Sequence, residues 1–171
     1  MSDIGGEIVI ILLLIVANGL FALSEMAVIT ARKSRLQDWI KRGNRRAKAA
    51  LELALAPNRF LSSVQIGITL IGILAGAFAG RGVAQWLASR IEGLPVIGPY
   101  SQEIGLGLVV LIITYVSLVI GELVPKRLAL RHPEPTATYV ALPLRLFIKI
   151  AAPMVYLLSV STDVVCRLFG R

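Results

Sequence analysis

The run Gly121-Glu122-Leu123-Val124-Pro125-Lys126 is the part of the sequence best suited to binding a cation. Proline lacks the backbone N–H, and its ring clashes with the carbonyl four residues earlier, here that of Gly121. The sequence therefore predicts a kinked helix in which the Gly121 carbonyl is released beside the Glu122 carboxylate. Free carbonyls at broken helices are a recurring means of binding cations within membranes. The alternative is that Glu122 and Lys126, spaced four apart in the favourable order, only pair with each other at a helix end.

Small oxygen-bearing residues accompany this run in its own apolar segment and in another. Ser63 and Gly67 lie four residues apart on one helix face, as do Ser117 and Gly121. Such pairs let backbones approach and offer hydroxyl and carbonyl oxygens to one ion, although Ser and Gly also suit ordinary helix packing. With Glu122 they form an all-oxygen donor set, which suits Mg²⁺, Ca²⁺ or Na⁺ better than soft transition metals. The residues alone do not choose among these three ions.

Other kinds of chemistry find no support in the residue types. His132 is the only histidine and has no nucleophile beside it, and no Gly-rich phosphate-binding loop occurs. The single cysteine, Cys166, has no intrachain disulfide partner. We therefore expect neither an enzyme nor a small-molecule substrate, and no cofactor or catalytic residue.

The elements that carry these residues must be membrane helices. Hydrophobic residues make up 56% of the 171-residue chain and charged residues 16%, whereas soluble proteins have about 45–50% and about 25%. The net charge is +8, but the cations cluster beside apolar runs. This arrangement indicates a lipid bilayer with anionic headgroups as the partner and argues against nucleic acid. The length predicts a single domain over residues 1–171.

Three apolar stretches are long enough to cross the bilayer, since a helix rises about 1.5 Å per residue and the hydrocarbon core is about 30 Å thick. The predicted spans cover about residues 5–30, 59–80 and 102–125. Nine Lys and Arg residues fall in 31–59, and none precedes the first span. The positive-inside rule then places the N-terminus outside and the C-terminus in the cytoplasm.

Two further segments, 34–56 and 136–169, are amphipathic and are predicted to lie along the cytoplasmic interface. Pro143 and Pro153 predict breaks in the second of them. The fold class is therefore an all-α membrane protein with three transmembrane helices per protomer and a juxtamembrane belt of amphipathic helices. A fourth span within 136–169 remains the alternative.

A stripe of small residues, Gly72, Gly76 and Gly80, runs along the second span. Small residues repeated every four positions let helices touch closely, either within one protomer or across a dimer. We assign this stripe to packing and not to chemistry.

Three ordered motifs resemble the transmembrane (DUF21) domain of the CNNM/CorC magnesium transporters. They are Asn18-Gly-Leu-Phe-Ala-Leu-Ser-Glu-Met-Ala, Ser62-Ser63-Val-Gln-Ile-Gly67 and Gly121-Glu122-Leu-Val-Pro-Lys126. The resemblance runs over nearly the whole chain. It implies a homodimer in the inner (plasma) membrane that exports Mg²⁺ from an inward-facing cavity, driven by Na⁺ entry. It also implies metal ligands at Ser24, Ser63, Gly67, Ser117, Gly121 and Glu122, with Asn18 nearby.

The sequence departs from that family in one respect. Members normally continue into cytoplasmic tandem CBS domains that bind ATP, whereas this chain ends at Arg171, so no nucleotide site is expected in it. Two other functions stay open. One is a membrane scaffold or sensor that anchors cytoplasmic domains without moving ions, and the other is a passive divalent-cation channel. Transport direction and stoichiometry do not follow from the residues.

Overall fold

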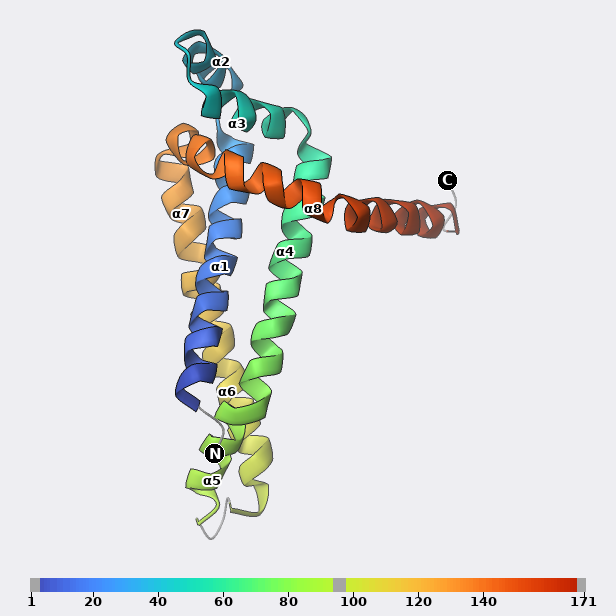
Figure 1. The fold of residues 1–171 in the computed structure, drawn as a ribbon. Coiled ribbons are helices and arrows are strands. Elements are labelled where there is room, and N and C mark those ends of the chain that lie inside the picture. Colours follow the sequence, from blue (N-terminus) through green and yellow to red (C-terminus); the bar gives the residue numbers. More distant parts are fainter. Residues whose placement is uncertain (1–3, 94–97, 169–171) are drawn as a thin grey trace. The chain divides into compact units, whose positions relative to one another are not determined.

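The computed structural model describes residues 4–93 and 98–168, without side-chain surroundings at positions 80, 81 and 168, and every regular element in these ranges is a helix. The chain is therefore all-α (Figure 1). Among the described residues, four helical stretches are long and apolar enough to cross a membrane. They are Ile4–Thr30, Pro57–Phe78, Gly98–Arg131 and Pro133–Arg167.

The chain divides into two compact units. The first unit comprises Met1–Ala22 with Ile68–Arg127, and the second unit comprises Leu23–Gly67 with Leu128–Arg171. The long helices α1 (Ile4–Thr30) and α4 (Pro57–Phe78) each contribute to both units.

The first unit is a helical bundle in which two α-helical stretches continue into π-helices. The end of α4 continues into the π-helix η1 (Ala79–Val83) and then α5 (Ala84–Ile91). After the short 3₁₀ turn η2 (Gly98–Tyr100), α6 (Ser101–Leu118) continues into the π-helix η3 (Val119–Leu123) and α7 (Val124–Arg131). Close packing of α5 on α6 depends on Gly105, because a Cβ there would lie 3.0 Å from the Ala84 carbonyl oxygen.

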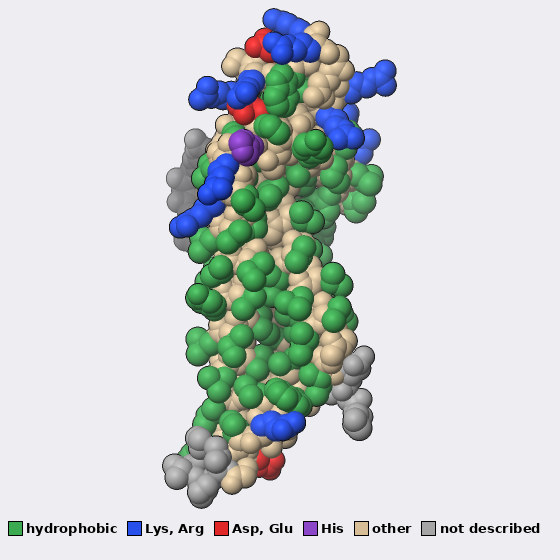
Figure 2. All heavy atoms as spheres, turned by 90° about the vertical axis from the view of Figure 1, so that its left-hand side faces the viewer, with side chains coloured by type: hydrophobic (Ala, Val, Ile, Leu, Met, Phe, Trp, Pro, Cys, Tyr) green, Lys and Arg blue, Asp and Glu red, His purple; other side chains and the backbone are tan. Residues whose placement is uncertain are grey.

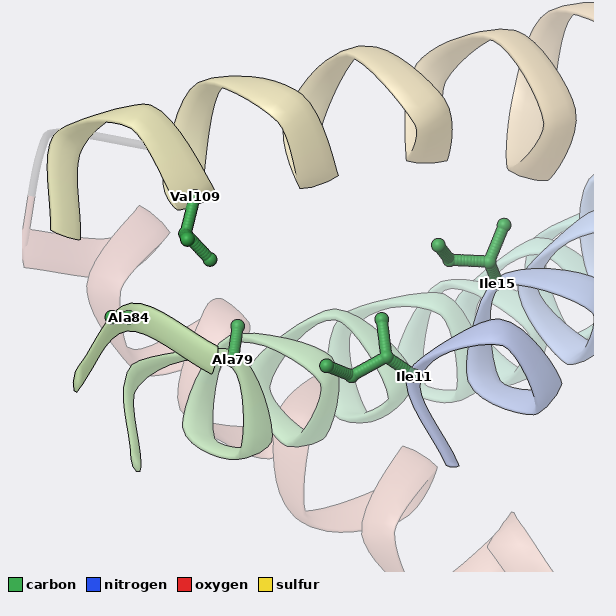
Figure 3. Packing of buried hydrophobic residues seen from close by; sticks show 5 residues of the cluster. All are labelled: Ile11, Ile15, Ala79, Ala84 and Val109. Carbon is green, nitrogen blue, oxygen red and sulfur yellow. The ribbon is translucent and has the colours of Figure 1, made fainter. Parts of the chain in front are cut away.

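A small apolar cluster joins three stretches of the first unit. It contains Ile11 and Ile15 of α1, Ala79 and Ala84 near η1, and Val109 of α6, all of them buried (Figure 3). The outward side of the same helices is also apolar, for example at Leu13, Leu111 and Tyr115. On the face drawn in Figure 2, hydrophobic side chains cover much of the surface. An apolar surface of this extent is unfavourable in water, whereas contact with lipid accounts for it.

The second unit contains the basic helices α2 (Lys33–Lys41) and α3 (Arg45–Leu55) and the long helix α8 (Pro133–Leu168). Gly43 takes a φ of 87° between α2 and α3, a backbone conformation that glycine adopts without strain. The side-chain oxygen of Asn44 then caps α3 by accepting hydrogen bonds from the N–H groups of Arg46 and Ala47. Glu134, at the start of α8, is only 3% exposed. Its Oε2 forms an ion pair with Nη1 of Arg35 in α2 at 3.5 Å.

Helix α8 differs from the sequence-based expectation. The predicted breaks at Pro143 and Pro153 are absent, and one helix of 36 residues passes through both prolines. A stripe of buried residues explains this, because it continues past both prolines at alternating spacings of three and four: Ala141, Leu144, Ile148, Ala151 and Val155. Packing along that stripe outweighs the one backbone hydrogen bond that each exposed proline removes. Residue 169, the last of the predicted segment, lies outside the described residues.

Candidate cation site

Before Pro125, where the sequence predicts a kink, the chain forms the π-helix η3. At its end the Val124 N–H donates to the Val119 carbonyl, five residues back, and Pro125 follows without an N–H to offer. The Gly121 carbonyl accepts a hydrogen bond from the Asn18 side-chain amide of α1 at 3.0 Å. The carbonyl expected to leave the helix ladder is therefore used by a side chain 103 positions away in the sequence.

Two glycines allow α1 to approach η3 this closely. A Cβ on Gly19 would lie 3.1 Å from Cγ of Pro125 and 3.2 Å from the Ile120 carbonyl oxygen. A Cβ on Gly121 would lie 3.2 Å from the Ile15 carbonyl oxygen. Both glycines are buried, so each backbone packs directly against the other helix. Larger residues at either position would push the Asn18 amide away from the carbonyl it bonds.

The other end of the Asn18 amide lacks a partner. Its Oδ1 atom is buried and has no hydrogen-bond partner among the described residues. Buried acceptors of this kind are uncommon in native proteins, and a role as a ligand of water or of an ion is one physical reason for them. An amide oxygen is a hard ligand of the type that Mg²⁺ and Ca²⁺ use. Asn18 thus donates to η3 through its amide nitrogen, while its amide oxygen has no partner among the described residues.

Glu122 bonds with its neighbour four residues along the helix. Its Oε1 lies 2.8 Å from Nζ of Lys126, and the two side chains are 41% and 27% exposed respectively. The ion pair named as the alternative from the sequence is therefore present. It places an ammonium group where a cation would meet the carboxylate. Ser117, one turn before Gly121 on α6, is half-buried.

The remaining predicted ligands belong to the second unit. Ser63 is fully buried and its hydroxyl donates to the Arg59 carbonyl at 2.8 Å, which leaves the oxygen lone pairs able to accept. Ser24 is 3% exposed, and Gly67 is buried. The structure brings Asn18 and Gly121 together in the first unit. That the predicted ligands of the two units bind one ion stays a prediction.

The described residues contain no group of three or more His, Cys, Asp and Glu side chains arranged to hold a metal. A cation held by fewer than three such side chains would need neutral oxygens for its remaining ligands.

One polar feature of the first unit was missed by sequence reasoning. A Cβ on Gly82 of η1 would overlap the carboxylate of Glu7, and the Oε2 atom of Glu7 is buried without a hydrogen-bond partner among the described residues. The signal available in the sequence is that Glu7 is an ionisable residue inside the predicted span 5–30.

The described elements form an all-helical membrane domain. Its polar π-helix, η3, lies between α-helical stretches whose outward side is apolar. Residues 9–171 match the family described as the Cyclin M transmembrane N-terminal domain. The chain therefore belongs to the CNNM family of membrane proteins, and the resemblance inferred from the three motifs is confirmed.

Similar proteins occur in several bacteria. Over 169 residues, 99% of its length, the chain is 55% identical to the UPF0053 protein sll0260 of Synechocystis sp., of which it covers 38%. It is 32% identical to the UPF0053 protein YhdT of Bacillus subtilis, with 99% of the chain and 37% of that protein aligned. It is also 32% identical to the UPF0053 inner membrane protein YfjD of Escherichia coli, with 88% and 32% aligned. The chain thus spans well under half the length of these relatives.

Proposed function

We propose that this chain is the ion-translocating membrane domain of a Na⁺-coupled Mg²⁺ exporter. The observation that carries the proposal is the orphaned Oδ1 of Asn18, buried on the amide that also holds the Gly121 carbonyl of η3. Membership of the CNNM family supports it, because three motifs of this chain resemble those of the CNNM/CorC magnesium transporters. The Mg²⁺ ion binds largely dehydrated, in a cavity open to the cytoplasm.

The charge arrangement suggests how such a site empties and fills. A carboxylate compensates half of the charge of Mg²⁺, and Lys126 already lies 2.8 Å from that carboxylate. Because an ammonium and a Mg²⁺ ion repel each other at short range, they are alternative partners of Glu122. In the proposed cycle Lys126 neutralises Glu122 when the ion is absent and withdraws when the ion arrives. Ser24, Ser63, Gly67 and Ser117 complete the oxygen set by resemblance to the family motifs.

We further propose that three of the four apolar stretches cross the membrane and that α8 lies along its cytoplasmic surface with α2 and α3. The 36 residues of α8 would rise about 54 Å, which is far more than the hydrocarbon core of about 30 Å requires. Arg145 and Lys149 are exposed in the middle of α8, where a spanning helix would place them in hydrocarbon. The proposed location is the inner (plasma) membrane. The positive-inside rule then places the N-terminus outside and the C-terminus in the cytoplasm.

A homodimer is the proposed assembly. Cβ atoms added to Gly72 and Gly76 of α4 would meet nothing within 4 Å, so this part of the small-residue stripe is not occupied by contacts within the protomer. Small residues on an open helix face in a membrane are suited to close packing against another helix. A second copy of the chain supplies that helix in the proposed assembly.

A membrane scaffold or sensor is the second candidate function, and the Glu122–Lys126 ion pair is the observation that favours it. In that case the pair only stabilises a helix, and the Asn18 contact only fixes helix packing. A passive cation channel is separated from both by whether Mg²⁺ flux requires a Na⁺ gradient.

The test is Mg²⁺ flux into or out of proteoliposomes, followed with a Mg²⁺-sensitive dye, with and without an opposing Na⁺ gradient. Replacement of Glu122 by Gln should abolish flux, because it removes the one carboxylate in the ligand set. Glu103, an exposed acidic residue in the first turn of α6, provides the matched control, and Glu103→Gln should transport normally. Full transport by a folded Glu122→Gln protein would contradict the proposal.

A further inference from the structure

A basic cavity lies in the second unit, where α8 packs over the end of α3 and the start of α4. It has a volume of about 250 Å³. Three cationic side chains line it together with apolar ones: Arg59, Arg145 and Lys149, with Leu53, Phe60 and Ile148. Several cationic side chains beside apolar ones suit a ligand that has an anionic group attached to an apolar part.

The positive charge of this cavity is only partly compensated. Glu52 pairs with Arg145 at 3.3 Å. Within the described part of the chain, neither Arg59 nor Lys149 forms an ion pair. The first N–H groups of α4 lie at the same place, and the leading N–H groups of a helix have no partner within it. Two uncompensated cations beside a helix N-terminus favour a bound anion.

A second cavity continues from the first along α4 and α8. Its volume is about 450 Å³, and it shares Arg59 with the basic cavity. Ser62 of α4 and Ala152, Val155 and Tyr156 of α8 line it. With α8 on the cytoplasmic surface, as proposed above, this groove would lead from the cations toward the hydrocarbon, because α4 enters its apolar span after Arg59.

We propose that the two cavities together bind one anionic phospholipid. Its phosphate contacts Arg59, Arg145 and Lys149, and one acyl chain lies in the groove between α4 and α8. Basic pockets between helices at the cytoplasmic surface suit anionic headgroups, whereas a free phosphate ion would leave the apolar groove empty. The bound lipid joins α8 to α4 and so fixes the belt helix against the start of a membrane-spanning helix. The site requires α8 at the membrane interface but does not require Mg²⁺ transport.

The test measures lipid retention by the purified chain with native mass spectrometry. The probes are dioleoylphosphatidylglycerol, dioleoylphosphatidylcholine and soluble glycerol phosphate. The pocket variant is Arg59→Gln with Lys149→Gln. Its matched control is Arg45→Gln with Lys48→Gln, which removes the same charge from exposed positions of α3 outside the cavity. Circular dichroism checks that both variants keep their helix content.

The proposal expects preferential retention of phosphatidylglycerol over phosphatidylcholine and no retention of glycerol phosphate. Each cation near an anionic lipid contributes about 1 kcal/mol, so the pocket variant should bind phosphatidylglycerol roughly 25-fold more weakly, while the control keeps its affinity. Replacing Ala152 by Phe should weaken binding without any change of charge, because the ring would occupy the groove. Equal losses in the pocket and control variants would show that attraction is diffuse and would overturn the proposal. Retention of glycerol phosphate, or of both lipids alike, would overturn it as well.

Discussion

The two π-helices of the first unit share one design and differ in how they are completed. Each presents a glycine to a polar residue of α1, Gly82 of η1 to Glu7 and Gly121 of η3 to Asn18. In each pair the polar side chain has one buried oxygen without a hydrogen-bond partner in the described ranges. In η3 a proline follows and Asn18 bonds the released carbonyl, whereas no proline follows η1.

Under the proposed function, this difference separates a π-helix that holds a ligand, η3, from one whose space is filled by a side chain, η1. Glu7, Ile11, Ile15 and Asn18 follow one another along one face of α1, so the apolar cluster around Ile11 and Ile15 separates the two polar positions. At η3 the Asn18 nitrogen is fixed by its bond to the Gly121 carbonyl, and a neutral amide oxygen is left without a partner among the described residues. At η1 a flexible carboxylate occupies the space itself. We therefore expect substitutions at η3 to cost more than substitutions at η1.

The largest expected effect follows from Gly121→Ala. Its Cβ would lie 3.2 Å from the Ile15 carbonyl oxygen and 3.3 Å from Nδ2 of Asn18, and a backbone oxygen cannot easily move aside. We expect a loss of about 3 kcal/mol in stability, near the upper end of overpacking costs. Thermal unfolding in detergent measures it. Gly107→Ala on α6 is the control, since a Cβ there meets nothing within 4 Å. Equal unfolding temperatures for both variants would disprove the close contact.

A smaller effect is expected from Asn18→Ala. The substitution removes the donor to the Gly121 carbonyl and should lower stability by about 1–2 kcal/mol, because a half-buried acceptor is left without its bond. The unfolding temperature again reports this, and Mg²⁺ should no longer raise it. If Asn18 serves packing alone, the Mg²⁺ response would survive the substitution, and the ligand role would have to be abandoned.

The smallest effect is expected from Gly82→Ala in η1. The added Cβ overlaps only the end of the Glu7 side chain, which can rotate away, so the expected cost is about 0.5–1 kcal/mol. Combining it with Glu7→Ala should remove most of that cost. A penalty at Gly82 as large as the one at Gly121 would mean that Glu7 is held as firmly as Asn18, and the contrast between the two π-helices would be lost.

Local signals in the sequence predicted much of this structure. Pro125 has no N–H, and the sequence accordingly predicted a disturbed helix at Gly121, where η3 lies. Long-range packing was not predictable in the same way. The bond from Asn18 to Gly121 depends on two helices meeting, and α8 stays continuous because its buried stripe outweighs two prolines. The overlap of Glu7 with Gly82 also depends on the approach of two distant segments, which no local pattern records.

Mg²⁺ titration of the purified chain, followed by the unfolding temperature, tests the central claim most directly. The account predicts a saturable rise in the wild-type protein that Na⁺ weakens, that Glu122→Gln abolishes and that Glu103→Gln leaves intact. A flat response in the wild-type protein, or the same rise in Glu122→Gln, would contradict the claim that the oxygens around η3 hold a cation. The Glu122–Lys126 pair would then be a helix contact and nothing more.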